Sequence, residues 1–147
     1  MIYLADTNVL LRLALRQQPL YPVARAAVVK LRKGGDQLLI TSQGCVEFWN
    51  AATRPQASNG FGLNIVDTDR LLRFIERVFT LIPDGPDVYL AWRNLVMTFG
   101  VSGVKVYDAR LVATMQVHGI TRILTFNTHD FTRYANTGIV AVDPATI

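Results

Sequence analysis

The chain has 147 residues, half of them apolar and 18% charged, with a formal net charge of +4. This composition excludes a disordered chain, and the length suffices to bury about two thirds of the unfolded surface. The single cysteine, Cys45, excludes an internal disulfide, and no apolar run reaches the roughly 18 residues of a membrane helix. We therefore expect one cytoplasmic domain over residues 1–147, without a secretory signal or membrane association.

Short apolar runs alternate with longer segments of helical period, which predicts an α/β fold with a central parallel sheet. The expected strands are Ile2–Ala5, Gln37–Thr41, Phe79–Ile82, Arg122–Phe126 and Ile139–Val142. The expected helices are Asn8–Arg16, Tyr21–Arg32, Gly44–Thr53, Thr68–Val78, Asp87–Phe99 and Val106–His118. Glycines follow three of these helices, where left-handed C-terminal residues are expected: Gly34 and Gly35, Gly100, and Gly119. The stretch TRPQASNGFGLN, residues 53–64, is predicted to be a long loop between helices.

Acidic and amide side chains recur where the predicted strands end. Asp6 directly follows the first strand, and Glu47 falls in the first or second turn of the helix after the second strand. Asp108 lies near the start of the helix that precedes the fourth strand, and Asn127 and Asp130 follow that strand. Because ligand chemistry gathers outside the carboxyl ends of parallel strands, we expect these four segments to converge at one edge.

Each acid also has a plain structural interpretation. Asp6 suits a helix cap, Glu47 and Asp108 suit early helical positions, and Asp130 suits a cap of the turn FTRY. Taken together, clustered carboxylates repel one another, and burying them is costly unless a positive charge joins them. A hard divalent cation such as Mg²⁺ or Mn²⁺ prefers oxygen ligands and activates water for attack on a phosphodiester.

Four motifs together resemble a known family. They are LADTNVLLRL at the start, CVEFWNA around Glu47, YDARLVATM around Asp108 and ILTFNTHDF near the end. The chain resembles PIN-domain ribonucleases, specifically the VapC-type toxins of bacterial toxin–antitoxin pairs, over nearly its whole length. The resemblance implies an α/β/α sandwich, an acidic Mg²⁺ or Mn²⁺ site and endonuclease action on RNA.

The resemblance also implies roles for individual residues. Asp6, Glu47 and Asp108 match the three core acids of the family. The expected mechanism has Asp6 and Asp108 binding the ion, while Glu47 holds or deprotonates the attacking water. Asn8 and Thr125 are expected to orient the acidic side chains without binding the metal ion themselves.

The fourth acidic position of the family is open in this chain. The family often has aspartate directly after the strand that ends in TF, where this chain has Asn127, and Asp130 follows three residues later. An amide carbonyl still holds a metal ion or its water, so the departure weakens a second metal site more than the first.

Basic residues give the weakest predictions. Arg54 and Arg110 are candidates for phosphate contacts at the rim, and Arg12 and Arg16 lie one helical turn apart. All four also suit solvated surface charge. The net charge favours a polyanionic partner without identifying it.

The partners follow from the resemblance. An uncontrolled ribonuclease injures its own cell, so a cognate antitoxin is expected to insert a segment into the acidic groove, with an arginine in the electrostatic place of the metal. A homodimer is also expected. Four aromatic side chains suit the groove, a dimer interface or the core: Phe48, Trp49, Trp92 and Phe99.

Other classes fit less well. A haloacid-dehalogenase-type phosphatase needs a second aspartate two residues after Asp6, where this chain has Asn8. A response-regulator receiver needs a pair of adjacent acids after its first strand, where this chain has Asp6 alone. A nucleotide-binding enzyme has no support, because the chain has no glycine-rich phosphate loop. The remaining alternative is a non-catalytic PIN-like module that binds RNA or a partner protein, although such a module has no reason to keep three mutually repelling acids.

Overall fold

A five-stranded sheet lies at the centre of the molecule, and all of its strand pairs are parallel. The computed structural model describes all residues from 1 to 147. The strand order is β3-β2-β1-β4-β5. The strands are β1 Ile2–Ala5, β2 Gln37–Thr41, β3 Thr80–Ile82, β4 Arg122–Leu124 and β5 Val140–Val142. The predicted α/β class with a parallel sheet is therefore confirmed.

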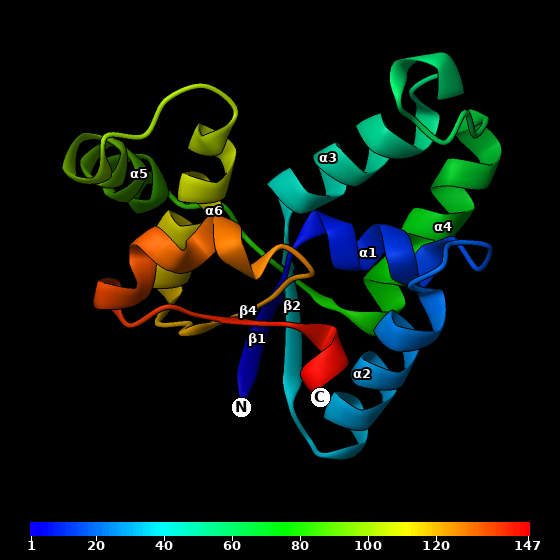
Figure 1. The fold of residues 1–147 in the computed structure, drawn as a ribbon, viewed down its shortest axis with the longest axis horizontal. Helices are drawn as coiled ribbons and strands as arrows, with labels where there is room; N and C mark the ends of the chain where they lie inside the picture. The colour runs from blue at the N-terminus through cyan, green and yellow to red at the C-terminus, as the bar shows by residue number, and fades with distance from the viewer.

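Helices cover both faces of this sheet, so the fold is an α/β/α sandwich (Figure 1). The first face carries α1 Thr7–Ala14, α2 Tyr21–Lys33, α3 Ser42–Thr53 and α4 Ile65–Val78. The second face carries α5 Pro86–Phe99, α6 Lys105–His118 and the 3₁₀ segment η2 Thr128–Thr137. Two further short 3₁₀ turns are η1 Gln56–Ser58 and η3 Pro144–Thr146. None of the helices combines the length and the apolar character that a membrane span needs.

The central strand β1 explains the two hydrophobic cores. Tyr3 and Ala5 point to the face covered by α1 to α4, whereas Leu4 points to the face covered by α5 and α6. All three side chains are buried, because a parallel strand with helices on both sides has no solvent face. The pairing of Leu4 with Leu39 and with Ile123 aligns the carboxyl ends of β2, β1 and β4 at one edge.

Several predicted boundaries differ from the structure. The helix predicted from Thr68 begins at Ile65, because the Asn64 side chain accepts a hydrogen bond from the backbone N–H of Asp67 at 2.8 Å. The fourth strand ends at Leu124 and not at Phe126. There the backbone N–H of Asn127 turns back to donate to Thr125 Oγ1 at 3.0 Å.

The predicted loop 53–64 is more ordered than expected. It contains η1 and folds back on α3, where the N–H of Phe61 donates to the carbonyl of Ala51 at 3.0 Å and that of Leu63 donates to Ala52 at 2.9 Å. The predicted turn FTRY is part of the longer η2. Of the four aromatic residues considered above, Phe48 is fully buried and belongs to the first core.

Candidate active site

Asp6 is the first residue after β1 and caps α1. Its Oδ1 accepts a hydrogen bond from the backbone N–H of Thr7 at 2.7 Å. Its Oδ2 accepts from Thr125 Oγ1 at 2.7 Å and from Asn8 Nδ2 at 2.9 Å. The helix-cap geometry is therefore present, and the same carboxylate is also held by a hydroxyl from the neighbouring strand end.

Burial changes the charge behaviour of Asp6. Its side chain is almost wholly buried, and the loss of solvation raises its pKa from 3.8 to about 6. The hydrogen bond from Thr125 lowers the pKa, whereas the charges of Asp108 and Glu47 raise it. A buried carboxylate with two acidic neighbours is a group that gains stability from a cation.

Glu47 lies on α3, and two hydrogen bonds orient its carboxylate. Thr7 Oγ1 donates to its Oε2 at 3.0 Å, and Gln43 Nε2 donates to its Oε1 at 2.8 Å. Thr7 sits next to Asp6 in the chain, so the cap of α1 and the first half of α3 are joined at the carboxyl edge of the sheet.

A polar network behind Glu47 was not predicted from the sequence. Gln43 also donates to the carbonyl of Tyr107 at 3.0 Å and accepts from Arg110 Nη1 at 3.0 Å. Arg110 in turn lies 3.3 Å from Asp84 Oδ1, and Ser42 donates to the other oxygen of Asp84. The spacing of Gln43 and Glu47, four residues apart on one helix face, was the available signal.

Asp108 lies in the first turn of α6, and a lysine accompanies it. Lys105 Nζ is 3.7 Å from Asp108 Oδ2 and 2.7 Å from Asp130 Oδ1. Burial raises the pKa of Asp108, and the charges of Asp130 and Glu47 act in the same direction, while Lys105 opposes them. Asp130 therefore pairs with Lys105, and no side-chain cap of η2 is present.

The side chains of Asn8 and Thr125 hold the backbone at this edge, whereas that of Asn127 does not. Asn8 Nδ2 donates to Thr125 Oγ1 at 3.0 Å, while its Oδ1 accepts from the N–H of Phe126 at 3.1 Å. The side chain of Asn127 is exposed and makes no hydrogen bond. Asp130 and Asp108 share Lys105, so Asp130 is the better connected of the two candidates for the fourth position.

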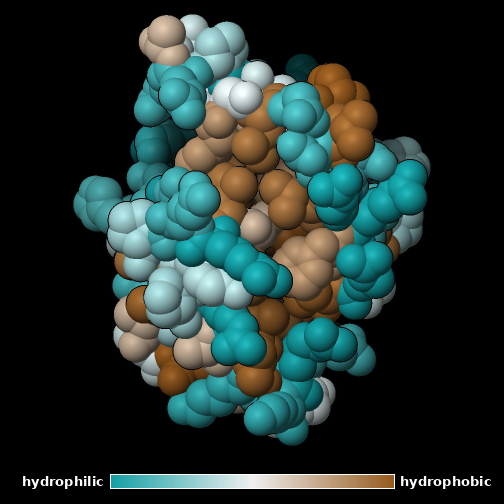
Figure 2. All heavy atoms as spheres, turned by 90° about the vertical axis from the view of Figure 1, so that its right-hand side faces the viewer, coloured by the Kyte–Doolittle hydropathy of each residue, from teal (hydrophilic) through white to brown (hydrophobic).

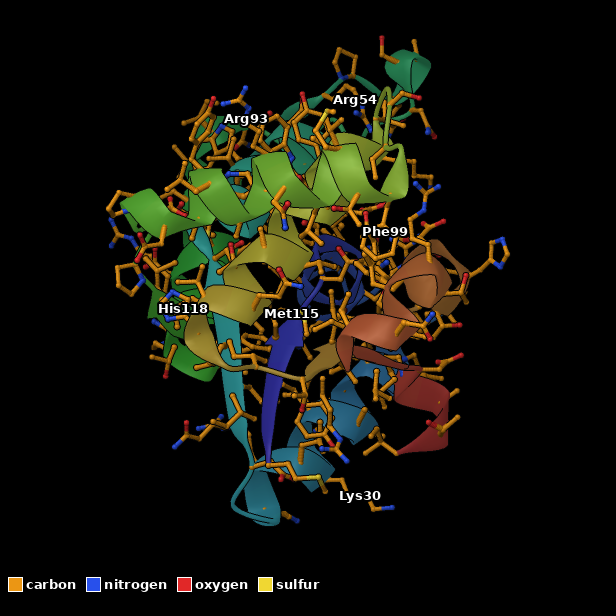
Figure 3. The ribbon with its side chains drawn as sticks, turned by 90° about the vertical axis from the view of Figure 1, so that its left-hand side faces the viewer. Lys30, Arg54, Arg93, Phe99, Met115 and His118 are labelled. Carbon is orange, nitrogen blue, oxygen red and sulfur yellow. The ribbon has the colours of Figure 1, made fainter.

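The two predicted rim arginines lie in different environments. Arg54 is at the C-terminal end of α3, about 10 Å along the helix from Glu47 at 1.5 Å per residue, and Figure 3 shows it near the top of the molecule. Its Nη2 donates to the carbonyl of Asn59 at 2.8 Å, and its Nε is buried without a partner. Arg110 is the arginine that reaches the site, through Gln43.

A groove of about 580 Å³ opens beside Glu47 and Asp108, whereas the buried Asp6 does not line it. Its polar lining includes Glu47, Lys105, Asp108 and Asp130. In the arrangement of this structure, no three acidic, histidine or cysteine side chains approach one another closely enough to hold a metal ion. The donors themselves are carboxylate oxygens, the ligands that hard divalent cations prefer, and the charges of Asp6, Glu47 and Asp108 influence one another. The donor chemistry of these carboxylates thus fits such a cation.

Solved structures with the same fold include several toxin–antitoxin proteins. VapBC-1 from nontypeable Haemophilus influenzae is 16% identical with a TM-score of 0.69, and the match covers 98% of both chains. VapBC2 from Rickettsia felis, bound to a promoter DNA fragment, is 12% identical with a TM-score of 0.70 over 97% of this chain and 98% of its own. VapC20 from Mycobacterium tuberculosis, a sarcin–ricin loop cleaving toxin, is 16% identical with a TM-score of 0.64 over 97% and 98%.

At these identities the likeness establishes the fold. No curated protein sequence is significantly similar to the chain. The sequence profile described as "PIN domain" matches residues 3–136. Because this match spans most of the 147 residues, the chain belongs to the PIN domain family.

Proposed function

We propose that this chain is a Mg²⁺- or Mn²⁺-dependent endoribonuclease and the VapC-type toxin of a toxin–antitoxin pair. The observation that carries the proposal is the buried Asp6 carboxylate, whose pKa is raised by burial and by the nearby charges of Asp108 and Glu47. A purely structural cap has no need of two further acids beside it. The chain acts as a single cytoplasmic nuclease domain over residues 1–147.

The proposed chemistry is hydrolysis of an RNA phosphodiester. A divalent cation bound here would lower the pKa of water and offset the charge that builds on the phosphate. Asp6 and Asp108 would hold the cation, and Glu47 would hold the attacking water and accept its proton. Thr7 and Gln43 fix the two oxygens of Glu47, which keeps this base in one orientation.

The supporting residues have separate tasks in this proposal. Thr125 and Asn8 donate to Asp6 Oδ2 and leave the carboxylate little rotational freedom. Asp130 fills the fourth acidic position more readily than Asn127, since it lines the groove with Glu47 and Asp108. Arg110 contacts the RNA phosphates at the rim of the groove. Arg54 contacts them near the C-terminal end of α3.

The antitoxin segment enters the acidic groove, with an arginine in the electrostatic place of the metal, and a second groove offers the antitoxin a further contact surface. This second groove has a volume of about 500 Å³, lies between α1, α2 and α4, and has an apolar floor that includes Val28, Phe74 and Val78. Four cationic side chains border it: Arg16, Arg25, Arg32 and Lys33. Figure 2 shows an apolar depression flanked by hydrophilic side chains on this face. An amphipathic segment with acidic flanks fits this groove, and a toxin–antitoxin complex from Klebsiella pneumoniae shares the fold.

A homodimer is supported by exposed apolar side chains on α5. Leu90 is 63% exposed and Met97 78%, and the two lie seven residues, about two helical turns, apart on this helix. Large apolar side chains gathered on one surface mark interfaces more often than isolated ones do. Size-exclusion chromatography with light scattering checks this: substitution of Leu90 and Met97 by serine is expected to yield monomers.

One observation favours the alternative of a non-catalytic PIN-like module. Lys105 already neutralises part of the charge on Asp108 and Asp130, as expected of a protein that works without a metal. Such a module binds RNA or a partner protein and leaves RNA intact.

Incubation with a pool of cellular RNA separates the two functions. The wild type is expected to cut at discrete sites with Mg²⁺ or Mn²⁺ and not with EDTA, and Asp6→Asn and Asp108→Asn are expected to abolish the cuts. Equal cutting by all three proteins contradicts the proposed site. RNA binding without any cutting supports the non-catalytic module.

A further inference from the structure

We propose that Lys105 is a built-in counter-ion that competes with the divalent cation for Asp108 and so sets how readily the site takes up metal. This inference rests on the proposed metal site. It adds a role for a residue that neither holds the metal nor contacts the reacting atoms.

The position of Lys105 supports competition. It is the first residue of α6, three residues before Asp108, and its ammonium reaches across to Asp130 in η2. The three side chains line the same groove and are partly exposed, Lys105 by 43%. A cation that approaches Asp108 from the groove therefore meets the ammonium.

The unequal distances from Lys105 to the two acids indicate which contact it loses when a metal ion binds. Its Nζ lies 2.7 Å from Asp130 and 3.7 Å from Asp108, so the stronger contact is with the acid outside the proposed pair of ligands. The long, flexible side chain keeps its contact with Asp130 when it leaves Asp108. Asp130 thus acts as the anchor to which Lys105 withdraws.

Lys105 is the cationic side chain that pairs with both Asp108 and Asp130. Arg110, two residues after Asp108, is instead paired with Asp84 and bonded to Gln43. Without Lys105, the carboxylates of Asp108 and Asp130 repel each other with no positive charge between them. The metal-free protein gains stability from Lys105, and metal binding has to displace part of that contact.

Mn²⁺ titration of the full-length protein, without RNA, tests the inference directly. Isothermal calorimetry or the electron paramagnetic resonance signal of free Mn²⁺ gives the Kd. Lys105→Met is expected to bind Mn²⁺ about fivefold more tightly than the wild type, the upper range for one partly exposed ion pair. Lys30→Met is the matched control, because Lys30 lies on α2 at the far end of the molecule (Figure 3) and its Nζ contacts only the carbonyl of Ile147.

Asp130 provides a second test. In an Asp130→Asn background Lys105 loses its anchor and pairs with Asp108 alone, so Lys105→Met is expected to improve Mn²⁺ affinity by a larger factor there. Circular dichroism checks folding, and Lys105→Gln replaces Lys105→Met if the latter does not fold.

Two outcomes overturn the inference in distinguishable ways. Unchanged or weaker Mn²⁺ binding by Lys105→Met, when the wild type binds, removes the competitive role of Lys105 and leaves the proposed function standing. No Mn²⁺ binding by either protein overturns both the role of Lys105 and the proposed metal site.

Discussion

The buried carboxylate of Asp6 is expected to destabilise the metal-free protein at neutral pH, and Asp6→Asn tests this. The pKa of Asp6 is raised from 3.8 to about 6. Each unit is worth about 1.4 kcal/mol, so keeping this group ionised costs the folded state about 3 kcal/mol relative to the unfolded chain. The asparagine variant removes that cost and keeps the acceptor for the N–H of Thr7.

The sign of the pH dependence follows from the raised pKa. Between about pH 4 and pH 6 the folded protein binds the Asp6 proton and the unfolded chain has released it, so stability falls as the pH rises through this window. About 2 kcal/mol of the Asp6 contribution is lost between pH 4.5 and pH 7.5. The variant lacks this loss, so its stability relative to the wild type should rise by that amount.

Urea unfolding with EDTA at the two pH values measures both proteins. Asp69→Asn is the control, since Asp69 forms only an exposed ion pair with Arg73 and its removal should change stability little. If the free energy of unfolding differs between Asp6→Asn and the wild type by the same amount at both pH values, the reasoning is refuted. Loss of the hydrogen bond from Thr125 in the variant would shift its free energy of unfolding equally at both pH values, so the predicted pH dependence would remain.

Two further predictions concern residues around the site and the loop. Gln43→Leu removes the donor to Glu47 Oε1 and is expected to slow RNA cleavage about tenfold with the fold unchanged by circular dichroism; full activity contradicts the orienting role of Gln43. Gly60→Ala is expected to lower the melting temperature, because an added Cβ would lie 1.9 Å from the carbonyl oxygen of Arg54. Gly85→Ala, where nothing lies within 4 Å, is the matched control and should melt near the wild-type temperature; equal melting of the two variants contradicts the close approach.

The sheet and its helices were predictable because their signals are local. β1 and β2 match the predicted ranges residue for residue. Gly100 and Gly119 adopt left-handed conformations at the ends of α5 and α6, as the sequence predicted, whereas after α2 it is Gly35 and not Gly34 that is left-handed. Apolar periodicity and glycine stops depend on near neighbours in the chain, so they are visible without the fold.

The arrangement of the site depends on contacts between distant segments. Parallel strands end at the same edge of the sheet, so the predicted strand ends indicated that Asp6 and Asp108 converge there. The charge of Asp108 accordingly raises the pKa of Asp6. The contact between Lys105 and Asp130 spans 25 residues and depends on the path of η2, which sequence patterns did not reveal. The end of β4 was placed two residues too late, because the Thr125 hydroxyl donates to Asp6 Oδ2 and accepts from the backbone N–H of Asn127, which turns the chain out of the strand.

Hydrolysis by an activated water is the central claim, and cleavage in H₂¹⁸O tests it most directly. A short RNA that the protein cuts is incubated with Mn²⁺ in labelled water, and the product ends are analysed by mass spectrometry. The account predicts a terminal phosphate that carries one ¹⁸O atom, and loss of this product in Asp108→Asn. A 2′,3′-cyclic phosphate without label would show attack by the ribose hydroxyl and contradict the roles given to Glu47 and the metal.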